Sequence, residues 1–254
     1  MKTVLITGAS DGIGKELAYK YAQDGYRLVL AARSEGKLQK LAEELKPAPV
    51  IVKRKDLSDM SQVRELYEEL KAESVQIDVL VNNAGFGLYG EFVRTSAEEE
   101  LNMIDLNIKS ITLLAKLFAP DMAARGSGHI LNVASTAAFQ PGPLMAVYYA
   151  TKAYVLSFSE AIENELKGTG ISVSVLCPGP TKTGFSDRAN LGQSKLFKSG
   201  VMDVKEVADA AYKGLQKKQT VIIPGLKNKI LAAAVRFMPR KTVTGVVRKT
   251  QERA

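Results

Sequence analysis

Short apolar runs alternate with amphipathic helical patterns along most of the chain, and this alternation limits the fold more than any other feature. The runs are rich in Val, Ile and Leu over four to six residues, which is typical of strands covered on both faces. The predicted strands are 3–7, 27–31, 50–53, 78–81, 129–134, 171–176 and 220–223. The predicted helical segments are 17–22, 35–46, 59–74, 98–125 (one or two helices), 147–166 and 204–217. Such alternation predicts an α/β fold, a doubly wound parallel sheet with helices on both faces, in a single domain.

The composition narrows the class of protein. At 254 residues, with 46% hydrophobic and 24% charged residues, the chain suits one soluble globular domain. Its single cysteine, Cys177, permits no internal disulfide, so we expect a reducing, cytoplasmic location. Its single histidine, His129, argues against a zinc site or a Ser-His-Asp triad, and we expect no metal. No signal-peptide pattern opens the chain, and no apolar run approaches the roughly 18 residues of a membrane span.

Glycines follow the first predicted strand and precede the first predicted helix. The segment 8–14 reads Gly-Ala-Ser-Asp-Gly-Ile-Gly. Glycine lets the backbone approach a ligand where a side chain would collide, and a helix N-terminus offers unpaired N–H groups and a positive dipole end to a pyrophosphate. A strand, glycines and a helix in this order therefore predict a dinucleotide site.

Tyr148 and Lys152 lie four residues apart in the predicted helix 147–166, so they share one of its faces. A free phenol, with a pKa of about 10, is a poor acid or base near neutrality. A neighbouring lysine cation favours the phenolate and lowers this pKa, which makes tyrosine a usable general acid or base. Ser135 directly follows the strand 129–134 and could present its hydroxyl beside the tyrosine. Taken alone, the pair could instead be an aromatic at the core boundary beside a solvated lysine.

These features occur together with others in the order found in the short-chain dehydrogenase/reductase family. The sequence resembles the shorter, single-domain form of that family over residues 1–225. The matching residues are Thr7, Gly8, Gly12, Gly14, Asp56, the run 82–85 (Asn-Asn-Ala-Gly), Asn107, Ser135, Tyr148, Lys152, Pro178 and Gly179. The resemblance implies a Rossmann-type sheet of about seven strands, a nicotinamide cofactor, and oxidation or reduction at an alcohol or carbonyl carbon. It also implies a small-molecule carbonyl or alcohol substrate and a homodimer or homotetramer.

The resemblance assigns four catalytic residues. Tyr148 is the proton donor in the reductive direction, and Lys152 lowers its pKa and binds the nicotinamide ribose. Ser135 positions and polarises the carbonyl oxygen. Asn107 kinks its helix and holds a water in the proton relay. Tyr149 competes for the tyrosine role, but it lies three residues from Lys152 rather than four, which favours Tyr148.

The resemblance also implies a cofactor-binding set that spans the chain. Asp56 would meet the adenine amino group, and residues 83–85 would support the central strand. Pro178, Gly179 and Thr183 would hold the nicotinamide carboxamide. The full predicted set is Gly8, Ser10, Asp11, Gly12, Ile13, Gly14, Arg33, Asp56, Leu57, Asn83, Ala84, Gly85, Tyr148, Lys152, Pro178, Gly179, Thr181 and Thr183.

The end of the second predicted strand indicates which nicotinamide is used. An acidic side chain there would bind the ribose hydroxyls of NAD, whereas a cation accommodates the 2′-phosphate of NADP. The acid position holds Ala32, and Arg33 follows, with Ser34 and Lys37 nearby. The alternative is an arginine that is merely solvated in a turn. Asp11 also stands where many NADP-using relatives have a basic residue. We predict a preference for NADP(H).

Loops at the carboxyl ends of the strands are expected to wall the substrate pocket. Their apolar candidates, which could equally pack the loops down, are Phe86, Phe139, Leu144, Met145 and Phe185. The polar, glycine-punctuated segment 181–200 is a candidate lid. Its cations, which could attract an acidic substrate or simply be solvated, are Lys182, Arg188, Lys195 and Lys198.

Residues 226–254 form a basic C-terminal extension. From residue 227 onward there are eight Lys or Arg and one acid, so this extension holds +7 of the net charge of +8. We expect it to be helical, with an apolar stretch at 230–238 that is too short to span a bilayer. It could pack over the substrate opening or form a subunit contact, or it could lie on an anionic membrane surface. Nucleic acid is the least favoured partner, because no readout motif accompanies the charge.

The sequence thus predicts an NADP(H)-dependent oxidoreductase that transfers hydride between nicotinamide and a carbonyl or alcohol carbon. The alternative is a redox sensor or scaffold that binds nucleotide without turnover. Such proteins commonly lose the tyrosine or the lysine that this chain keeps. The substrate and the preferred direction stay open.

Overall fold

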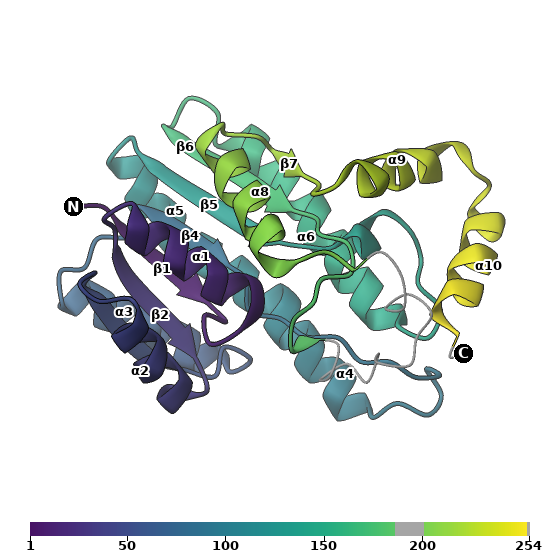
Figure 1. The fold of residues 1–254 in the computed structure, drawn as a ribbon, viewed down its shortest axis with the longest axis horizontal. Helices are drawn as coiled ribbons and strands as arrows, with labels where there is room; N and C mark the ends of the chain where they lie inside the picture. Colours follow the sequence, from purple (N-terminus) through teal and green to yellow (C-terminus); the bar gives the residue numbers. More distant parts are fainter. Residues whose placement is uncertain (186–200, 253–254) are drawn as a thin grey trace.

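The computed structural model describes residues 1–185 and 201–252, and its centre is a seven-stranded sheet (Figure 1). The strands are β1 (Thr3–Thr7), β2 (Arg27–Ala32), β3 (Val50–Arg54), β4 (Val79–Asn82), β5 (Gly128–Val133), β6 (Ile171–Leu176) and β7 (Val221–Ile222). Their order is β3-β2-β1-β4-β5-β6-β7, and every pairing between them is parallel. The order reverses between β1 and β4, which is the switch point where such sheets bind ligands. This arrangement confirms the predicted doubly wound parallel sheet.

Helices cover both faces of the sheet (Figure 1). They are α1 (Gly12–Gln23), α2 (Glu35–Glu44), α3 (Met60–Ala72), α4 (Ala97–Ile104), α5 (Ile111–Ala124), α6 (Ala146–Glu165) and α8 (Val204–Gln216). On one face, Leu17 of α1, Leu38 of α2 and Leu215 of α8 join the strand residues in one buried cluster. On the other face, Leu66 of α3 and Leu114 of α5 join a second cluster.

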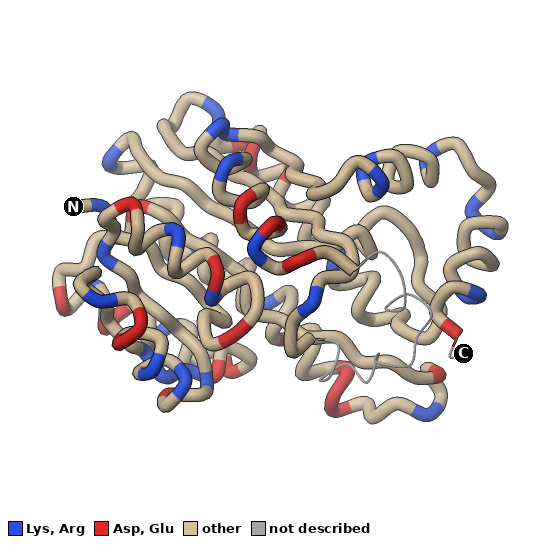
Figure 2. Tube along the Cα trace, viewed as in Figure 1, with Lys and Arg blue, Asp and Glu red and all other residues tan. Residues whose placement is uncertain are grey.

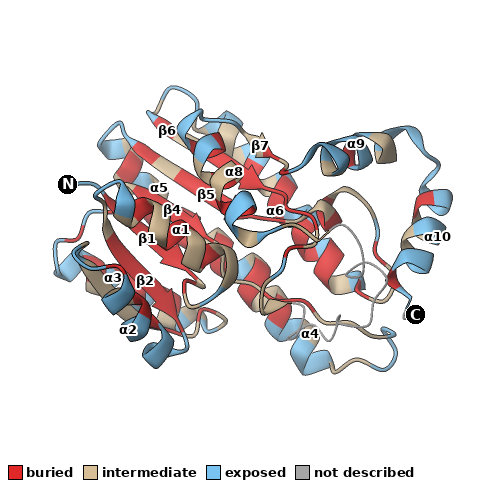
Figure 3. Ribbon diagram, in the orientation of Figure 1, coloured by how far each residue is buried: buried red, intermediate tan, exposed pale blue. Residues whose placement is uncertain are grey.

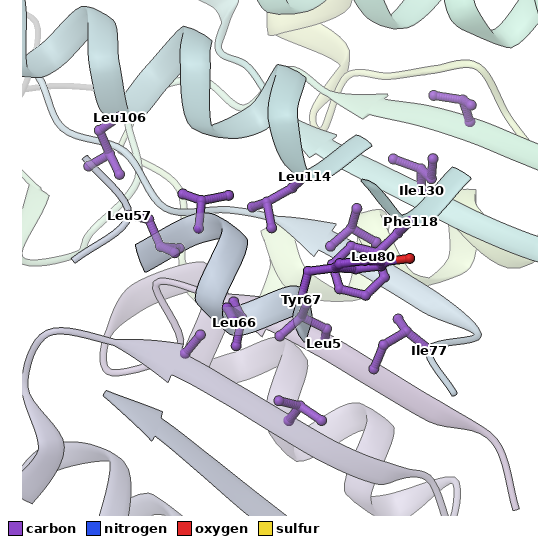
Figure 4. Close-up of a cluster of buried hydrophobic side chains, with 14 of the residues drawn as sticks. Leu5, Leu57, Leu66, Tyr67, Ile77, Leu80, Leu106, Leu114, Phe118 and Ile130 are labelled. Carbon is purple, nitrogen blue, oxygen red and sulfur yellow. The ribbon is translucent and has the colours of Figure 1, made fainter. Parts of the chain in front are cut away.

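Strand side chains that point to both faces explain the nearly continuous apolar runs in the sequence. In β1, Leu5 belongs to the cluster on the α3 side, whereas Val4 and Ile6 belong to the cluster on the α1 side. In Figure 4, Leu5 lies among side chains that include Leu66 and Phe118. Figure 3 shows the consequence, in which buried residues fill most of the strands and exposed residues cover the outer helix faces, while the edge strand β3 is less buried.

The strands and most helices end within one or two residues of the predicted positions, and β1 and β6 have the predicted bounds. The segment 98–125, predicted as one or two helices, contains two α-helices joined by a π-helical turn. There α4 continues through a π-helical turn, η1 (Asp105–Ser110), directly into α5. A π turn inside a helix often marks a functional site, and Asn107 lies within this one.

After β7 the chain continues into α9 (Leu226–Ala234), η4 (Val235–Phe237) and α10 (Arg240–Gln251). Figure 1 places these helices at the end of the molecule opposite the N-terminus. Figure 2 shows Lys and Arg along both α9 and α10. In residues 1–185 and 201–252, no helix is both long and apolar enough to cross a membrane.

The predicted lid, 181–200, is described only at its start. Thr181 pairs with Met202 in an isolated parallel bridge, and Lys182 is exposed. Residues 186–200 lie outside the described part of the chain. The predictions made for Arg188, Lys195 and Lys198 fall in that segment.

Candidate active site

The glycine turn between β1 and α1 is packed closely against the end of β4. Gly8 and Gly12 have φ values of +63° and +56°, which residues with a side chain rarely adopt. A Cβ at Gly8 would lie 2.9 Å from the Cα of Ala84, and a Cβ at Gly14 would lie 2.5 Å from the Nδ2 of Asn83. The turn therefore requires glycine for both its backbone conformation and its packing.

Thr7 and Asn83 fasten this turn to β4. The Thr7 hydroxyl donates to the carbonyl of Val81 (3.1 Å) and accepts from the N–H groups of Asn83 (2.9 Å) and Ala84 (3.0 Å). The Asn83 side-chain amide donates to the carbonyls of Thr7 (2.9 Å) and Gly8 (3.2 Å). Residues 83 and 84 thus support the turn from the β4 side.

Asp11 caps the N-terminus of α1. Its Oδ1 accepts a hydrogen bond from the N–H of Gly12 at 2.7 Å. This bond satisfies one of the N–H groups that a helix leaves unpaired at its start. The cap gives a structural reason for an acidic residue at a position where many NADP-using relatives have a basic one.

Arg33 stands at the end of β2, where Ala32 is the last strand residue. The Arg33 side chain is 54% exposed, and its guanidinium lies 3.9 Å from the carboxylate of Asp56. Asp56 in turn accepts hydrogen bonds from the N–H (3.0 Å) and the hydroxyl (2.7 Å) of Ser58. A long, solvated ion pair is weak, so the Arg33 guanidinium keeps donors for a phosphate.

α6 brings Tyr148 and Lys152 to one face, as their spacing predicts. The Lys152 Nζ lies 5.8 Å from the centroid of the Tyr148 ring. It donates to the carbonyl of Val133, at the end of β5, at 2.9 Å. Both side chains are buried, with exposures of 8% for Tyr148 and 4% for Lys152. A buried lysine therefore stands beside a buried phenol at the carboxyl end of the sheet.

The pKa values of this pair differ from the sequence-based prediction. Burial raises the pKa of Tyr148, and a hydrogen bond with the Ser135 side chain opposes that rise only in part. Burial also lowers the pKa of Lys152 to about 8, because the ammonium loses its water shell. The prediction that Lys152 holds the Tyr148 pKa below its usual value is wrong for this structure, because desolvation dominates and the lowering influence on the Tyr148 pKa comes from Ser135 rather than from Lys152.

Ser135 is the N-cap of the short 3-10 helix η2 (Thr136–Phe139), two residues after the end of β5. Its Oγ accepts from the N–H of Ala137 at 3.1 Å and approaches the carbonyl of Pro178 at 3.4 Å. Its side chain also hydrogen-bonds with Tyr148. The serine hydroxyl thus lies beside the phenol, as its position after the strand predicts.

Tyr149, the competing tyrosine, is held by other partners. Its hydroxyl accepts a hydrogen bond from the side-chain amide of Gln251, in α10. Its ring packs over Gly142, where an added Cβ would lie 2.2 Å away. Burial raises the Tyr149 pKa to about 12. These contacts give Tyr149 a packing role and favour Tyr148 as the proton donor.

Asn107 lies in the π turn η1 and is fully buried. Its Oδ1 accepts from the N–H of Phe86 (3.1 Å), and its Nδ2 donates to the carbonyl of Phe86 (2.9 Å) and to the hydroxyl of Thr151 (3.0 Å). A Cβ added at Gly85 would lie 2.9 Å from the Asn107 Oδ1 and 3.5 Å from the Lys152 Nζ. Asn107 therefore joins the segment after β4 to α6 close to the lysine.

The segment after β6 approaches the glycine turn from the other side. The Thr181 hydroxyl donates to the carbonyl of Gly179 at 2.9 Å. A Cβ added at Gly12 would lie only 3.0 Å from the Cγ2 of Thr183. The predicted carboxamide-binding segment and the glycine turn therefore meet across one opening.

That opening is a cleft of about 700 Å³. All the predicted catalytic and cofactor-binding residues line it except Gly14 and Asn107, which support its walls. The cleft fits a nicotinamide dinucleotide, because a side-chain-free turn and a cation stand at one end and a serine, a tyrosine and a lysine at the other. Residues 1–185 and 201–252 contain no group of three His, Cys, Asp or Glu side chains that could hold a metal ion.

Comparison with known families agrees with this geometry. The family model described as short chain dehydrogenase matches residues 2–194 of this sequence. The chain belongs to the short-chain dehydrogenase family.

Relatives of this short-chain dehydrogenase are oxidoreductases. It is 35% identical to the ketoacyl reductase HetN of a Nostoc species, over 87% of this chain and 78% of that protein. Its fold matches a short-chain dehydrogenase from Sphingobium yanoikuyae in complex with NADPH, with a TM-score of 0.84, 36% identity, and coverage of 93% of this chain and 94% of the other. It also matches a short chain dehydrogenase/reductase from Burkholderia phymatum in complex with NAD, with a TM-score of 0.83, 28% identity, and coverage of 100% and 97%. The family therefore supports an oxidoreductase that binds a nicotinamide cofactor.

The cleft of this short-chain dehydrogenase has a wall that the sequence interpretation left open. Residues of α9 and α10 line it, among them Asn228, Leu231, Val243 and Val247. The Asn228 side chain comes within 2.6 Å of a Cβ placed on Gly179. The sequence signal for this wall was the helical spacing of apolar residues in the C-terminal extension. Such spacing predicts a helix with an apolar face, but it does not show which part of the protein that face packs against.

The predicted apolar wall is confirmed in part. Met145 and Phe185 line the cleft, and the Phe185 ring lies 5.4 Å from the ring of Tyr148. Phe86, Phe139 and Leu144 are not among its lining residues. Phe86 belongs instead to the buried cluster, and Phe139 packs against another buried cluster.

Proposed function

We propose that this short-chain dehydrogenase is an NADP(H)-dependent oxidoreductase that interconverts a carbonyl and an alcohol, with Tyr148 as the general acid or base. The observation that carries this proposal is one cleft with Ser135, Tyr148 and Lys152 at one end and Arg33 at the other. The first group suits proton transfer at a carbonyl, and the second suits a phosphate.

The residues that would hold the cofactor come from four segments. The glycine turn and the N-terminus of α1 would take the pyrophosphate, and residues 56–57 would flank the adenine. Residues 83–85 would support the adenosine side, and residues 178–183 would hold the carboxamide. When bound, the nicotinamide supplies or accepts the hydride.

The chain itself supplies the proton and the polar contacts. Ser135 donates a hydrogen bond to the substrate oxygen and stabilises the negative charge that develops there. Tyr148 gives its proton to that oxygen in the reductive direction. Burial lowers the Lys152 pKa to about 8, so the side chain is still mostly cationic near neutrality and favours the phenolate left behind.

Arg33 supports a preference for NADP(H). It is the exposed cation next to Ala32, at the position where an acid would select NAD. The relatives do not decide the preference, because one was solved with NADPH and another with NAD. A homodimer or homotetramer and a cytoplasmic location belong to the same proposal, by family resemblance.

A nucleotide sensor without turnover is less favoured. Ser135, Tyr148 and Lys152 meet at one point of the cleft, and a sensor needs no such convergence.

The test of catalysis is Tyr148→Phe, assayed by NADPH oxidation over a panel of ketones and aldehydes. We expect turnover to be lost while NADPH binding, measured by its fluorescence, is retained. Tyr149→Phe is the matched variant and should keep most of the activity. Activity that survives in Tyr148→Phe but is lost in Tyr149→Phe would show that Tyr149, and not Tyr148, is the proton donor.

The test of the cofactor preference is Arg33→Ser. The ratio of kcat/KM for NADPH to that for NADH should fall about tenfold or more, since a charged hydrogen-bonding partner of the phosphate is lost. Arg64→Ser, an exposed arginine on α3, serves as the control. A wild type that prefers NADH would refute the argument from Arg33.

A further inference from the structure

The C-terminal helices turn an uncharged face to the cleft. The residues of α9, η4 and α10 that line it with apolar side chains include Leu231, Val235, Met238, Val243, Val246 and Val247. Asn228, Thr250 and Gln251 add neutral polar groups. None of the Lys or Arg residues of residues 226–252 is among the lining residues.

The spacing of these residues explains the separation of charge. In α10 the lining residues 243, 246, 247, 250 and 251 recur at helical intervals and so share one face. Lys241 and Arg248 fall on the opposite face, and both are exposed. The helix is therefore amphipathic, with its apolar side toward the cleft.

The helix pair is fixed to the body beside the proposed reaction centre. The side-chain amide of Gln251 donates to the hydroxyl of Tyr149, and the hydroxyl of Tyr89 donates to the backbone carbonyl of Gln251 at 3.0 Å. Ala232 of α9 and Val243 of α10 are buried, with exposures of 6% and 5%. The apolar face is thus part of the cleft wall rather than a detached arm.

Most of the charged residues that line the cleft lie away from the wall formed by α9 and α10. They lie in the glycine turn, just after β2 and β3, and in the first turn of α2, where the adenosine half of a cofactor would lie, and they are Asp11, Arg33, Lys37, Lys55 and Asp56. Only Lys152 is charged at the proposed reaction centre, within the described lining. In the described lining, a carboxylate or phosphate on the substrate would lose its water there with no cation other than Lys152 to pair with, which is costly.

We propose that the substrate is an uncharged carbonyl compound or alcohol with a long or bulky apolar body, and that this body lies against α9 and α10. The proposal rests on the proposed oxidoreductase function. It makes the C-terminal extension the determinant of substrate class.

The test compares kcat/KM for a series of methyl ketones from 2-butanone to 2-dodecanone with NADPH. For the full-length wild type, kcat/KM should rise about threefold per added methylene until the cleft is filled, since each buried methylene contributes to binding. A keto acid as long as 2-dodecanone should be a far poorer substrate. Displacement of an apolar fluorescent dye from the nucleotide-free protein by 2-dodecanol gives a readout that is independent of turnover.

Two variants place a charge on the wall at partly exposed positions, Leu231→Glu and Val246→Glu. Each should lower kcat/KM for 2-dodecanone about tenfold or more, because the buried alkyl chain would meet a charge. Gly245→Glu is the matched control, because it adds the same charge to the opposite face of α10, where an added Cβ meets nothing within 4 Å.

The outcomes separate the two proposals. Turnover of no carbonyl compound at all would refute the proposed function. Turnover of 2-butanone with no gain from chain length, or equal losses in Val246→Glu and Gly245→Glu, would refute the apolar wall and leave the oxidoreductase standing.

The outer face of α9 and η4 carries a second, separate feature. Leu226, Ile230 and Phe237 are 74%, 59% and 88% exposed. They recur at intervals of four and seven residues, and none of them lines the cleft. Exposed large apolar side chains that recur in this way mark an interaction surface.

Cations surround this apolar stripe. Lys227 and Lys229 lie beside it on α9, and Arg236, Arg240 and Lys241 follow at its end. All five are exposed. Glu252 is the one acid of residues 226–252. The face therefore combines apolar side chains with a strong positive charge.

We infer that this face, residues 226–241, docks on the surface of an anionic lipid bilayer. Apolar side chains flanked by Lys and Arg match the boundary between acyl chains and negative headgroups. A second copy of the chain placed on the same face would bring like charges together, which disfavours that occupant.

The test is co-sedimentation of the full-length protein with vesicles of phosphatidylcholine alone and of phosphatidylcholine with phosphatidylglycerol. We expect binding to the anionic vesicles only, weakened about tenfold or more in Phe237→Glu and Ile230→Glu. Phe92→Glu is the control, since Phe92 is a 69% exposed phenylalanine outside the extension. Equal binding to both vesicle types, an equal loss in Phe92→Glu, or self-association that Phe237→Glu abolishes would each overturn the inference.

Discussion

A lysine that is almost completely buried costs free energy unless its ammonium finds a partner. Lys152 has the carbonyl of Val133 as a partner at 2.9 Å, and burial still lowers its pKa to about 8. The sequence could predict that Lys152 and Tyr148 are neighbours, because helical spacing fixes which residues share a face. It could not predict the directions of their pKa shifts. Those depend on how much water the sheet and the loops exclude, which no local pattern contains.

The buried ammonium should make the stability of the protein depend on pH in a definite direction. Because the pKa of Lys152 is lowered to about 8 from an ordinary 10.5, the unfolded chain binds more protons between these values. The free energy of unfolding should therefore rise with pH from about 8 to 10.5, by at most about 3 kcal/mol for this residue. The raised pKa of Tyr148 acts in the opposite direction, but only above its ordinary value near 10.

Urea unfolding of the wild type and of Lys152→Met at pH 7, 8.5 and 9.5 checks this expectation. The wild type should gain stability relative to the variant as the pH rises. Lys116→Met removes an exposed lysine from α5 and should show a constant difference. A constant difference for Lys152→Met as well would mean that its ammonium is not desolvated.

At the scale of single elements, η1 shows why a helix is distorted at one place. Asn107 directs all three of its hydrogen bonds to Phe86 and Thr151, so it bridges the segment after β4 and α6. The π turn sets this side chain toward those partners, while α4 and α5 continue on either side. The resemblance predicted an irregular helix at Asn107, but hydrophobic periodicity did not, because its signal averages over several turns.

Asn107→Ala should destabilise the protein by about 2–4 kcal/mol, since it removes the three buried hydrogen bonds that Asn107 makes with Phe86 and Thr151. Chemical unfolding measures this change. Asn102→Ala, at an exposed position of α4, should change stability by less than about 0.5 kcal/mol. Similar small changes in both variants would show that Asn107 does not join the two segments.

The element boundaries that were predicted best belong to strands with strong constraints on both sides. β1 lies between a strand partner on each side and has helices on both faces, so each residue from Thr3 to Thr7 is buried. The C-terminal helices illustrate the opposite case. The apolar stretch 230–238 predicted a helix, but α10 depends on a cleft whose other walls come from residues far away in the sequence.

At the scale of the whole molecule, the last helix is tied to the middle of the chain. Gln251 bonds to Tyr149 and accepts from Tyr89, residues that lie more than a hundred positions earlier. The doubly wound sheet followed from the order of strands and helices. The attachment of α10 through Gln251 could not be predicted in this way, since a single glutamine has no recognisable pattern in the sequence.

Gln251→Leu should loosen α10 without unfolding the sheet. We expect faster proteolysis within residues 226–252 and a loss of about 1–2 kcal/mol at most, because the Tyr149 hydroxyl loses its donor. Limited proteolysis followed by mass spectrometry locates the cuts. Gln23→Leu, at the exposed end of α1, is the control. Protection of α10 in Gln251→Leu would show that the amide does not hold the helix.

α10 follows every other described helix and strand along the chain, and this order has a consequence for how the protein is made. Domains begin to fold while the chain is still being synthesised, starting from the N-terminus. The nucleotide-binding half is encoded early, whereas the last dozen or so described residues close the other half of the cleft. A nascent polypeptide would thus complete the turn proposed to bind the pyrophosphate before it completes the wall proposed to receive the substrate.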